Sequence, residues 1–330
     1  MARRQRLLIS ERSLEALAPE LRPHEAVLEC VPIQKALATQ ARDLDAAFIS
    51  REVTGASTKH EIHPDLQAVY DLMLANTSLR WVHIHSAGAD RAAYVSLRAR
   101  GVAISTSSGS NAPVVASSAL AGLLAQARRL PMLLREQQRR EWTPLMGAGR
   151  MPRDLPGQTV TIVGWGPIGQ QIARGVQALD MQVVAVRTRA MPDEAGVRMV
   201  AFDALPSVLP RTDWLVLACP LTETTHRFIG SRELRSMPRG AQLINVARGE
   251  CVRQAELIEV LQEGHLGGAC LDVFEHEPLP SDSPLWDMPQ VIITPHGAGH
   301  ADGNEGRVAR MFLSNLQRWL QDEPLINLVP

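Results

Sequence analysis

The sequence predicts an α/β protein built on parallel sheets with helices on their faces. Short apolar runs alternate with helical patterns along the chain, which is typical of this class. One apolar run leads directly into a glycine-rich turn and then into a helical pattern. With 330 residues, the chain is long enough for two domains, each with its own core.

The first half predicts a series of strands separated by helices. Strands are expected at residues 7–10, 26–30, 46–50, 79–85 and 102–105. Helical patterns cover residues 64–75 and 91–100. A longer helix is expected to start after Asn111, with Pro113 in its first turn, and to run to about Arg135. Residues 142–156, rich in Pro, Gly and Met, are interpreted as a connection.

The second half predicts a second alternating series. Its strands are expected at residues 159–163, 183–186, 214–218, 242–246, 269–273 and 291–294. A final helix is expected near residues 304–321, because its apolar residues recur on roughly one face.

Composition excludes several classes of function. The net charge of −1 provides no global field to recruit nucleic acid or an anionic membrane. No apolar stretch has the length of a secretory signal or a membrane span, so we expect a cytoplasmic protein. The four cysteines lack metal-type spacing and are expected to be reduced thiols.

A dinucleotide fingerprint follows the strand at residues 159–163. It has the form G-x-G-x-x-G and consists of Gly164, Trp165, Gly166, Pro167, Ile168 and Gly169. The strand before it and the helical pattern after it supply the context that this motif requires. In that setting the first two glycines permit a tight turn and backbone approach to a pyrophosphate, and the third permits close packing of helix on strand.

The next predicted strand ends in Arg187, Thr188 and Arg189. An NAD site normally has Asp or Glu here, to bind the ribose hydroxyls. Two guanidinium groups and a hydroxyl would instead bind a 2′-phosphate. The motif therefore favours NADP(H), with NAD(H) possible. The alternative is a pair of solvated surface arginines.

Three polar residues lie near predicted strand ends in the last third of the chain. They are Arg248, Glu277 and His296. A planar guanidinium can bind both oxygens of a 2-oxo acid, and an imidazole paired with a carboxylate can donate and accept a proton. Behind a nucleotide fingerprint, this set favours hydride transfer to a small carboxylate-bearing substrate.

Two further motifs lie in the first half. Small residues Ser86, Ala87 and Gly88 follow a strand and can turn backbone N–H groups onto a carboxylate; the alternative is a plain strand–helix turn. His83 and His85 would share one face of a strand, but no third ligand is evident nearby, so no metal site is expected.

Taken together, the motifs at residues 164–169, 245–249, 271–278 and 294–299 resemble those of the D-isomer-specific 2-hydroxyacid dehydrogenases. The stretch 272–299 is similar to the glyoxylate/hydroxypyruvate reductase branch. The resemblance implies two doubly wound domains, with a Rossmann-type nucleotide domain inserted in a flavodoxin-like substrate domain. Residues 1–112 and 300–330 would form the substrate domain and residues 113–299 the nucleotide domain.

The resemblance also implies roles for individual residues. Arg248 would bind substrate, His296 would exchange the proton, and Glu277 would be the partner of His296. Arg248 and His296 would contact both substrate and cofactor, and Ser86, Ala87 and Gly88 would bind the substrate. The rest of the implied cofactor site comprises Cys219, Pro220, Val246, Ala247, Asp272 and Gly297. A homodimer is implied as well.

Where the sequence departs from the family pattern, the departures change the expected choice of cofactor more than the expected reaction. Relatives commonly have Glu at Ser117, an acidic residue at Arg187 and a hydroxyl or small residue at Cys219. The sequence therefore predicts an NADPH-preferring reductase that converts glyoxylate, hydroxypyruvate or a close relative into the D-2-hydroxyacid. The alternatives are an NAD-dependent dehydrogenase with a bulkier substrate and a dinucleotide-sensing binding protein without significant turnover.

Overall fold

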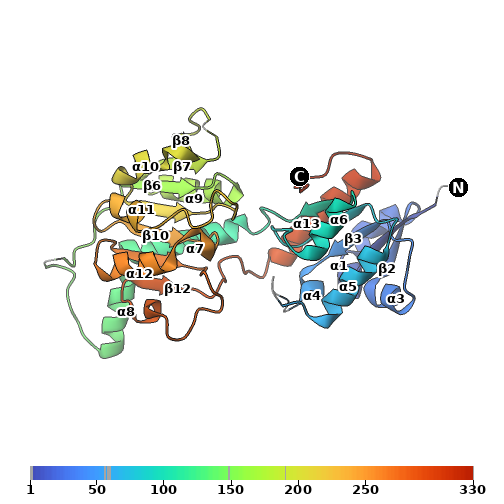
Figure 1. Ribbon diagram of the computed structural model, residues 1–330, viewed down its shortest axis with the longest axis horizontal. Coiled ribbons are helices and arrows are strands. Elements are labelled where there is room, and N and C mark those ends of the chain that lie inside the picture. Colours follow the sequence, from blue (N-terminus) through green and yellow to red (C-terminus); the bar gives the residue numbers. More distant parts are fainter. Residues whose placement is uncertain (1–2, 56, 58–60, 148, 190, 330) are drawn as a thin grey trace. The chain divides into compact units, whose positions relative to one another are not determined.

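The computed structural model describes residues 3–55, 57, 61–147, 149–189 and 191–329. The chain divides into two compact units. Unit 1 comprises Met1–Asn111 and Ala301–Pro330, and unit 2 comprises Ala112–His300. Each is an α/β unit on a parallel sheet, which confirms the predicted fold class (Figure 1).

Unit 1 contains a five-stranded parallel sheet in the order β2-β1-β3-β4-β5. The strands are β1 (Gln5–Ile9), β2 (Leu28–Pro32), β3 (Ala46–Ile49), β4 (Trp81–Ile84) and β5 (Ala103–Thr106). This order is that of flavodoxin-like sheets. The longer helices are α5 (Pro64–Ala75), α6 (Ala92–Ala99) and the C-terminal α13 (Asn304–Leu320); shorter ones are α1 (Glu11–Ala16), α2 (Ala18–Leu21), α3 (Ile33–Ala38) and α4 (Arg51–Thr54).

Alternate residues of the unit 1 strands enter two separate cores. Leu8, Ala47 and Val82 pack against one group of helices, which includes α3, α5 and α6. Leu7 and Phe48 pack on the other face, where α13 contributes Phe312 and Leu316. The last helix of the chain is therefore part of the first unit.

Unit 2 contains a seven-stranded parallel sheet in the order β12-β11-β10-β9-β6-β7-β8. The strands are β6 (Thr159–Val163), β7 (Gln182–Arg187), β8 (Val197–Ala201), β9 (Trp214–Leu217), β10 (Gln242–Asn245), β11 (Gly268–Leu271) and β12 (Val291–Ile293). The order reverses between β6 and β9, as in a Rossmann sheet.

Helices cover both faces of this sheet (Figure 1). One face packs against α7 (Ala112–Ala127) and α9 (Pro167–Gln177). The other packs against α10 (Leu205–Val208), α11 (Ser231–Ser236) and α12 (Gln254–Gln262). No helix in the described part of the chain is long and apolar enough to cross a membrane.

Two sequence predictions about these elements were incomplete or wrong. The edge strand β8 was missed. The single helix expected to run from Asn111 to about Arg135 is broken into α7 and α8 (Leu130–Arg139). Arg129 has the left-handed φ of 58°, and Pro131 lies in the first turn of α8. Proline lacks an N–H and its ring clashes with the preceding helical turn, so a single helix cannot continue through it.

Candidate active site

The predicted cofactor and catalytic residues of unit 2 follow the carboxyl ends of six strands. Since parallel strands present these ends at one edge of the sheet, the residues share that edge. In sheet order, His296 follows β12, Asp272 follows β11, Arg248 follows β10 and Cys219 follows β9. Gly164 then follows β6, and Arg187 ends β7. Several strands therefore lie between His296 and the arginine motif, which we define as Arg187, Thr188 and Arg189.

The fingerprint glycines have three distinct environments. Gly164 has a φ of 107°, and a Cβ there would lie 2.5 Å from the carbonyl oxygen of Ala218. A Cβ on Gly169 would lie 2.1 Å from the carbonyl oxygen of Gly164, so both positions require glycine for packing. Gly166, the N-cap of α9, has open space where its side chain would be. An open position at a helix N-terminus fits the approach of a pyrophosphate.

The arginine motif follows the fingerprint by one strand. Arg187 ends β7 half-buried, and its guanidinium contacts the sulfur of Met191. Thr188 and Arg189 are exposed. In the described part of the chain, no carboxylate forms an ion pair with either arginine. Among the described residues, neither guanidinium is therefore neutralised by a carboxylate, so both can bind an anion.

The loop that carries Arg248 is held by backbone and side-chain hydrogen bonds. After β10, the Asn245 side chain accepts from the N–H of Ala247 at 3.0 Å and donates to the carbonyl oxygen of Arg248 at 3.1 Å. A Cβ on Gly249 would lie 1.9 Å from the carbonyl carbon of Phe274, so the loop packs against the segment that leads to Glu277. The Arg248 side chain itself is exposed.

A second loop carries His296 and is anchored by Asp272. The Asp272 carboxylate is buried and accepts hydrogen bonds from the Thr294 hydroxyl at 2.6 Å and the Gly297 and Ala298 N–H groups at 2.8 and 3.0 Å. The N–H of His296 donates to the carbonyl oxygen of Asp272 at 2.8 Å. Sequence reasoning placed Asp272 near the cofactor but missed this anchoring of the loop.

His296 and Glu277 form a hydrogen-bonded pair. The imidazole Nδ1 lies 2.7 Å from Glu277 Oε2, while Oε1 accepts from the N–H of Phe274 at 3.0 Å. This contact leaves Nε2 of His296 as the nitrogen that can exchange a proton with a substrate.

The pair shifts both pKa values toward the charged forms. The hydrogen bond to Glu277 raises the pKa of His296. Burial opposes ionisation of Glu277, yet hydrogen bonds from His296 and Phe274 outweigh it and lower the pKa of Glu277. The positive charge of Arg248 acts on both groups, so Arg248 lies within electrostatic range of the His296–Glu277 pair in unit 2.

The predicted substrate loop lies in unit 1. Ser86 follows β4, and its hydroxyl donates to the carbonyl oxygen of Gly88 at 2.8 Å. Ser107 ties the loop to the sheet, because its N–H donates to the carbonyl oxygen of Ser86 at 3.1 Å. Ala87 is exposed at the tip. A role for these residues in substrate binding stays a prediction.

The two histidines of β4 are part of the packing of unit 1. His83 is fully buried between the hydroxyls of Ser105 at 2.8 Å and Ser107 at 3.0 Å, and burial lowers its pKa to about 3. Burial, then the charges of Arg51 and Arg91, lower the pKa of His85 to about 4. Among the described residues, no group of three or more His, Cys, Asp or Glu could hold a metal ion.

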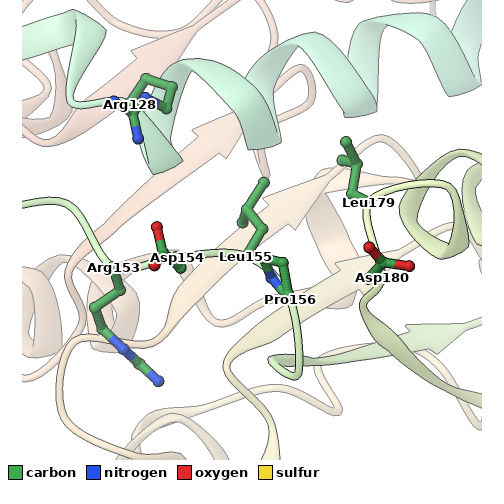
Figure 2. A pocket seen from close by; sticks show the side chains of 7 residues that line it. All are labelled: Arg128, Arg153, Asp154, Leu155, Pro156, Leu179 and Asp180. Carbon is green, nitrogen blue, oxygen red and sulfur yellow. The ribbon is translucent and has the colours of Figure 1, made fainter.

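A hollow of about 310 Å³ elsewhere on unit 2 contains none of the predicted site residues. Figure 2 shows the side chains that line it: Arg128, Arg153, Asp154, Leu155, Pro156, Leu179 and Asp180. Arg153 extends away from the others and is paired with Asp213 at 2.9 Å. Because residues 153–156 precede β6 and residues 179–180 precede β7, this hollow lies at the amino ends of these strands, away from the predicted site.

Comparison with known proteins identifies the family. Residues 120–298 match the family model "D-isomer specific 2-hydroxyacid dehydrogenase, NAD binding domain". A glyoxylate reductase of Korarchaeum cryptofilum is 35% identical over 262 residues, 77% of each chain. Glyoxylate/hydroxypyruvate reductase B of Escherichia fergusonii is 30% identical over 285 residues, 86% of this chain and 88% of the relative.

A solved structure has the same overall fold. The probable 2-hydroxyacid dehydrogenase of Rhizobium etli, crystallised with NADP, HEPES and L(+)-tartaric acid, aligns with a TM-score of 0.76 at 25% identity. The alignment covers 100% of this chain and 98% of that structure. The resemblance predicted from the sequence motifs, including that to the glyoxylate reductase branch, is confirmed. The chain therefore belongs to the D-isomer-specific 2-hydroxyacid dehydrogenase family of oxidoreductases.

Proposed function

We propose that the protein reduces a small 2-oxo acid, of the glyoxylate or hydroxypyruvate class, to the D-2-hydroxyacid with NADPH. The observation that carries this proposal is the His296–Glu277 pair beside Arg248, on the unit that matches the NAD-binding family model. The relatives named as glyoxylate reductases support the substrate class.

The residues at the carboxyl edge of the sheet fit a dinucleotide. Gly166 leaves space at the start of α9 for a pyrophosphate, with Trp165, Pro167 and Ile168 completing the turn. Arg187, Thr188 and Arg189 would bind the 2′-phosphate. Cys219, Pro220, Val246, Ala247, Asp272 and Gly297 would line the path of the cofactor, together with Arg248 and His296. When bound, the nicotinamide supplies the hydride.

The chain's own residues would bind the substrate and handle the proton. The guanidinium of Arg248 binds the carboxylate and the adjacent carbonyl oxygen, and Ser86, Ala87 and Gly88 hold the carboxylate through their backbone. His296 donates its Nε2 proton to the carbonyl oxygen as negative charge develops there. Glu277 stabilises the imidazolium that must be present before this transfer.

His296→Gln tests the proton-transfer role directly. Loss of a general acid is expected to lower kcat by about 10²–10⁴-fold. Binding of NADPH, followed by fluorescence titration, is expected to stay nearly unchanged. A variant that turns over at the rate of the unmodified protein would assign the proton to another group.

A cofactor-oxidation screen of the purified protein tests the whole proposal. NADPH and NADH are each offered with a panel of 2-oxo acids of increasing side-chain size. The expected result is faster oxidation of NADPH with the smallest members, and chiral chromatography should identify the D-product. Preference for NADH with bulky substrates would support the NAD-dependent alternative. Cofactor binding without turnover on any member would support a sensing protein.

We also propose that the protein is a cytoplasmic homodimer. Exposed apolar side chains near α8, namely Leu134, Trp142 and Met146, support association. Light scattering should give twice the chain mass of 36.1 kDa.

A further inference from the structure

The loop that precedes α11 meets the turn that carries Glu277. Arg227 lies in this loop, and Nη1 of its guanidinium is 3.5 Å from Oε1 of Glu275. Glu275 follows β11 and is two residues before Glu277. The side chain of Arg227 is 53% exposed, whereas that of Glu275 is only 22% exposed. An ion pair therefore joins a loop outside the predicted site to the turn that carries the partner of His296.

The carboxylate of Glu275 depends on this ion pair. Its Oε1 atom is buried and accepts no hydrogen bond from any residue that the structure describes. A buried carboxylate oxygen without a hydrogen bond is costly unless a cation lies nearby. Because Arg227 supplies that cation, removing its charge should drive the Glu275 side chain toward water and displace the backbone of the turn.

The backbone of the same turn is closely packed. The N–H of Glu275 donates to Oε1 of Gln254 at 3.3 Å, and the N–H of Phe274 donates to Oε1 of Glu277 at 3.0 Å. A Cβ on Gly249 would lie 2.5 Å from the nitrogen of Glu275. A shift of Glu275 should therefore reach Glu277 through the N–H of Phe274.

The backbone of Arg227 contacts the loop that carries Arg248. Its N–H donates to the carbonyl oxygen of Glu250, two residues after Arg248, at 2.7 Å. Arg227 has a left-handed φ of 53°, which is uncommon for a residue other than glycine. It therefore contacts two segments that carry predicted catalytic residues, one through its main chain and the other through its side chain.

We propose that Arg227, paired with Glu275, is a positioning residue that keeps Glu277 in hydrogen-bond contact with His296. It acts through the turn and not by direct contact with the reacting atoms. The distance of 2.7 Å between Nδ1 of His296 and Oε2 of Glu277 is the geometry that it maintains. The importance of this geometry for turnover rests on the proposed function, in which His296 donates the proton.

The protonation of His296 reports on this geometry. In the described part of the chain, the charges that act on its imidazole are those of Glu277, Arg248 and Asp272. The hydrogen bond from Glu277 raises the pKa of His296, so displacement of Glu277 should lower that pKa. Direct loss of a positive charge would instead raise the pKa of an imidazole, so the direction of the change separates the two effects.

Arg227→Gln removes the charge and keeps a side chain of similar length. The pKa of His296 is measured by NMR titration of the imidazole signals of the full-length protein, with His296→Gln identifying the resonance. We expect a lower pKa than in the unmodified protein, and an alkaline limit of reduction that falls with it. We expect kcat/KM to decrease by about tenfold or more, since a misplacement of about 1 Å in a catalytic group can cost about 10²-fold.

Matched variants test whether the two residues act as a pair. Arg227→Lys should restore most of the loss, because a single contact at 3.5 Å needs a cation and not a planar fork. Glu275→Gln should also lower the pKa of His296, and adding it to Arg227→Gln should cause little further loss. Arg235→Gln, which breaks the ion pair with Glu263 elsewhere on unit 2, is the control and should leave the titration unchanged.

An unchanged or higher pKa of His296 in Arg227→Gln would overturn the proposal. Losses in kcat/KM that multiply in the double variant would overturn it as well, because they would show that Arg227 and Glu275 act independently. A lower pKa of His296 in a protein that turns over no 2-oxo acid would contradict the proposed reductase function and leave the positioning role standing.

Discussion

His296 has a left-handed backbone, with a φ of 48°, and its loop is fixed by the buried Asp272 carboxylate. This conformation is uncommon for a residue other than glycine and is held by its surroundings. The ring is fixed in turn by Glu277. Both the position and the protonation of the imidazole therefore depend on neighbouring carboxylates.

Glu277→Gln should shift the pH profile of reduction. Reduction needs the imidazolium, so activity falls as pH rises through the pKa of His296. Since Glu277 raises that pKa, its neutral replacement should move the alkaline limit to lower pH. Initial rates across pH 5–10 check this, with His296→Gln, which lacks the titrating group, as the control. If the alkaline limit of reduction stays where it is in the unmodified protein, Glu277 is not the group that raises the pKa of His296.

Arg248→Lys keeps the charge and removes the planar fork. Loss of bidentate contact with a 2-oxo acid should reduce kcat/KM by about 10²-fold or more. NADPH affinity should be retained, because the predicted phosphate contacts lie after β6 and β7. Steady-state rates and a cofactor titration on the same variant separate the two effects. A collapse of cofactor binding with an unchanged KM for substrate would place Arg248 in the nucleotide site.

At the scale of elements, the turn after β7 should set the choice of cofactor. Each charge-assisted hydrogen bond to a 2′-phosphate contributes about 1.5–3 kcal/mol. We expect a preference for NADPH of at least about tenfold in kcat/KM, equivalent to ~1.4 kcal/mol. Arg187→Asp should reverse it by repelling the phosphate. Arg198→Asp, an exposed change on the neighbouring strand β8, is the matched control. Equal use of both cofactors by the unmodified protein contradicts the assignment.

The elements that the sequence predicted are those with a strong local pattern. The eleven predicted strands were found because most are short apolar runs largely buried in a parallel sheet. The edge strand β8 was missed because the exposed Arg198 interrupts its short apolar pattern. Pro131 indicates the break before α8, but the apolar pattern that continues past it led to the prediction of a single helix.

Site residues divide in the same way. Arg248, Glu277 and His296 could be predicted as candidates because each lies within a recognisable motif. The anchoring of Thr294, Gly297 and Ala298 by Asp272 arises only when separate strands align in the sheet. Such contacts have no spacing in sequence from which they could be predicted.

At the scale of the molecule, the C-terminal helix α13 packs against strands from the N-terminal part of the chain in the core of unit 1. Phe312 of α13 stacks on Phe48 with ring centroids 4.1 Å apart, and Asn315 lies 3.4 Å from Nδ1 of the buried His83. A proton on His83 would place a charge in this core, because both ring nitrogens already contact uncharged partners.

Unit 1 should therefore lose stability in acid. The pKa of His83 falls from 6.5 to about 3 on folding, so the unfolded chain binds the extra proton between these values. The free energy of unfolding should decrease by about 1.4 kcal/mol per pH unit as pH falls from 6.5 toward 3, and His85 adds to the decline. Urea unfolding from pH 7 to pH 4 measures the slope. In His83→Gln, which cannot titrate, the free energy of unfolding should depend less steeply on pH. An equal slope in both proteins would mean that other groups cause the loss of stability in acid.

The loop that carries Arg248, together with Glu277 and His296, lies within residues 245–298, in the continuous chain of unit 2. The discontinuous unit 1 contributes none of their hydrogen-bond partners that the structure describes. The predicted acid–base residues and the Rossmann-type sheet therefore belong to one continuous stretch of chain. Under the proposed function, substitutions in the unit 1 loop at Ser86, Ala87 and Gly88 would change which hydroxyacid is accepted and would leave the His296–Glu277 pair intact, which is one route by which a single architecture can serve many hydroxyacids.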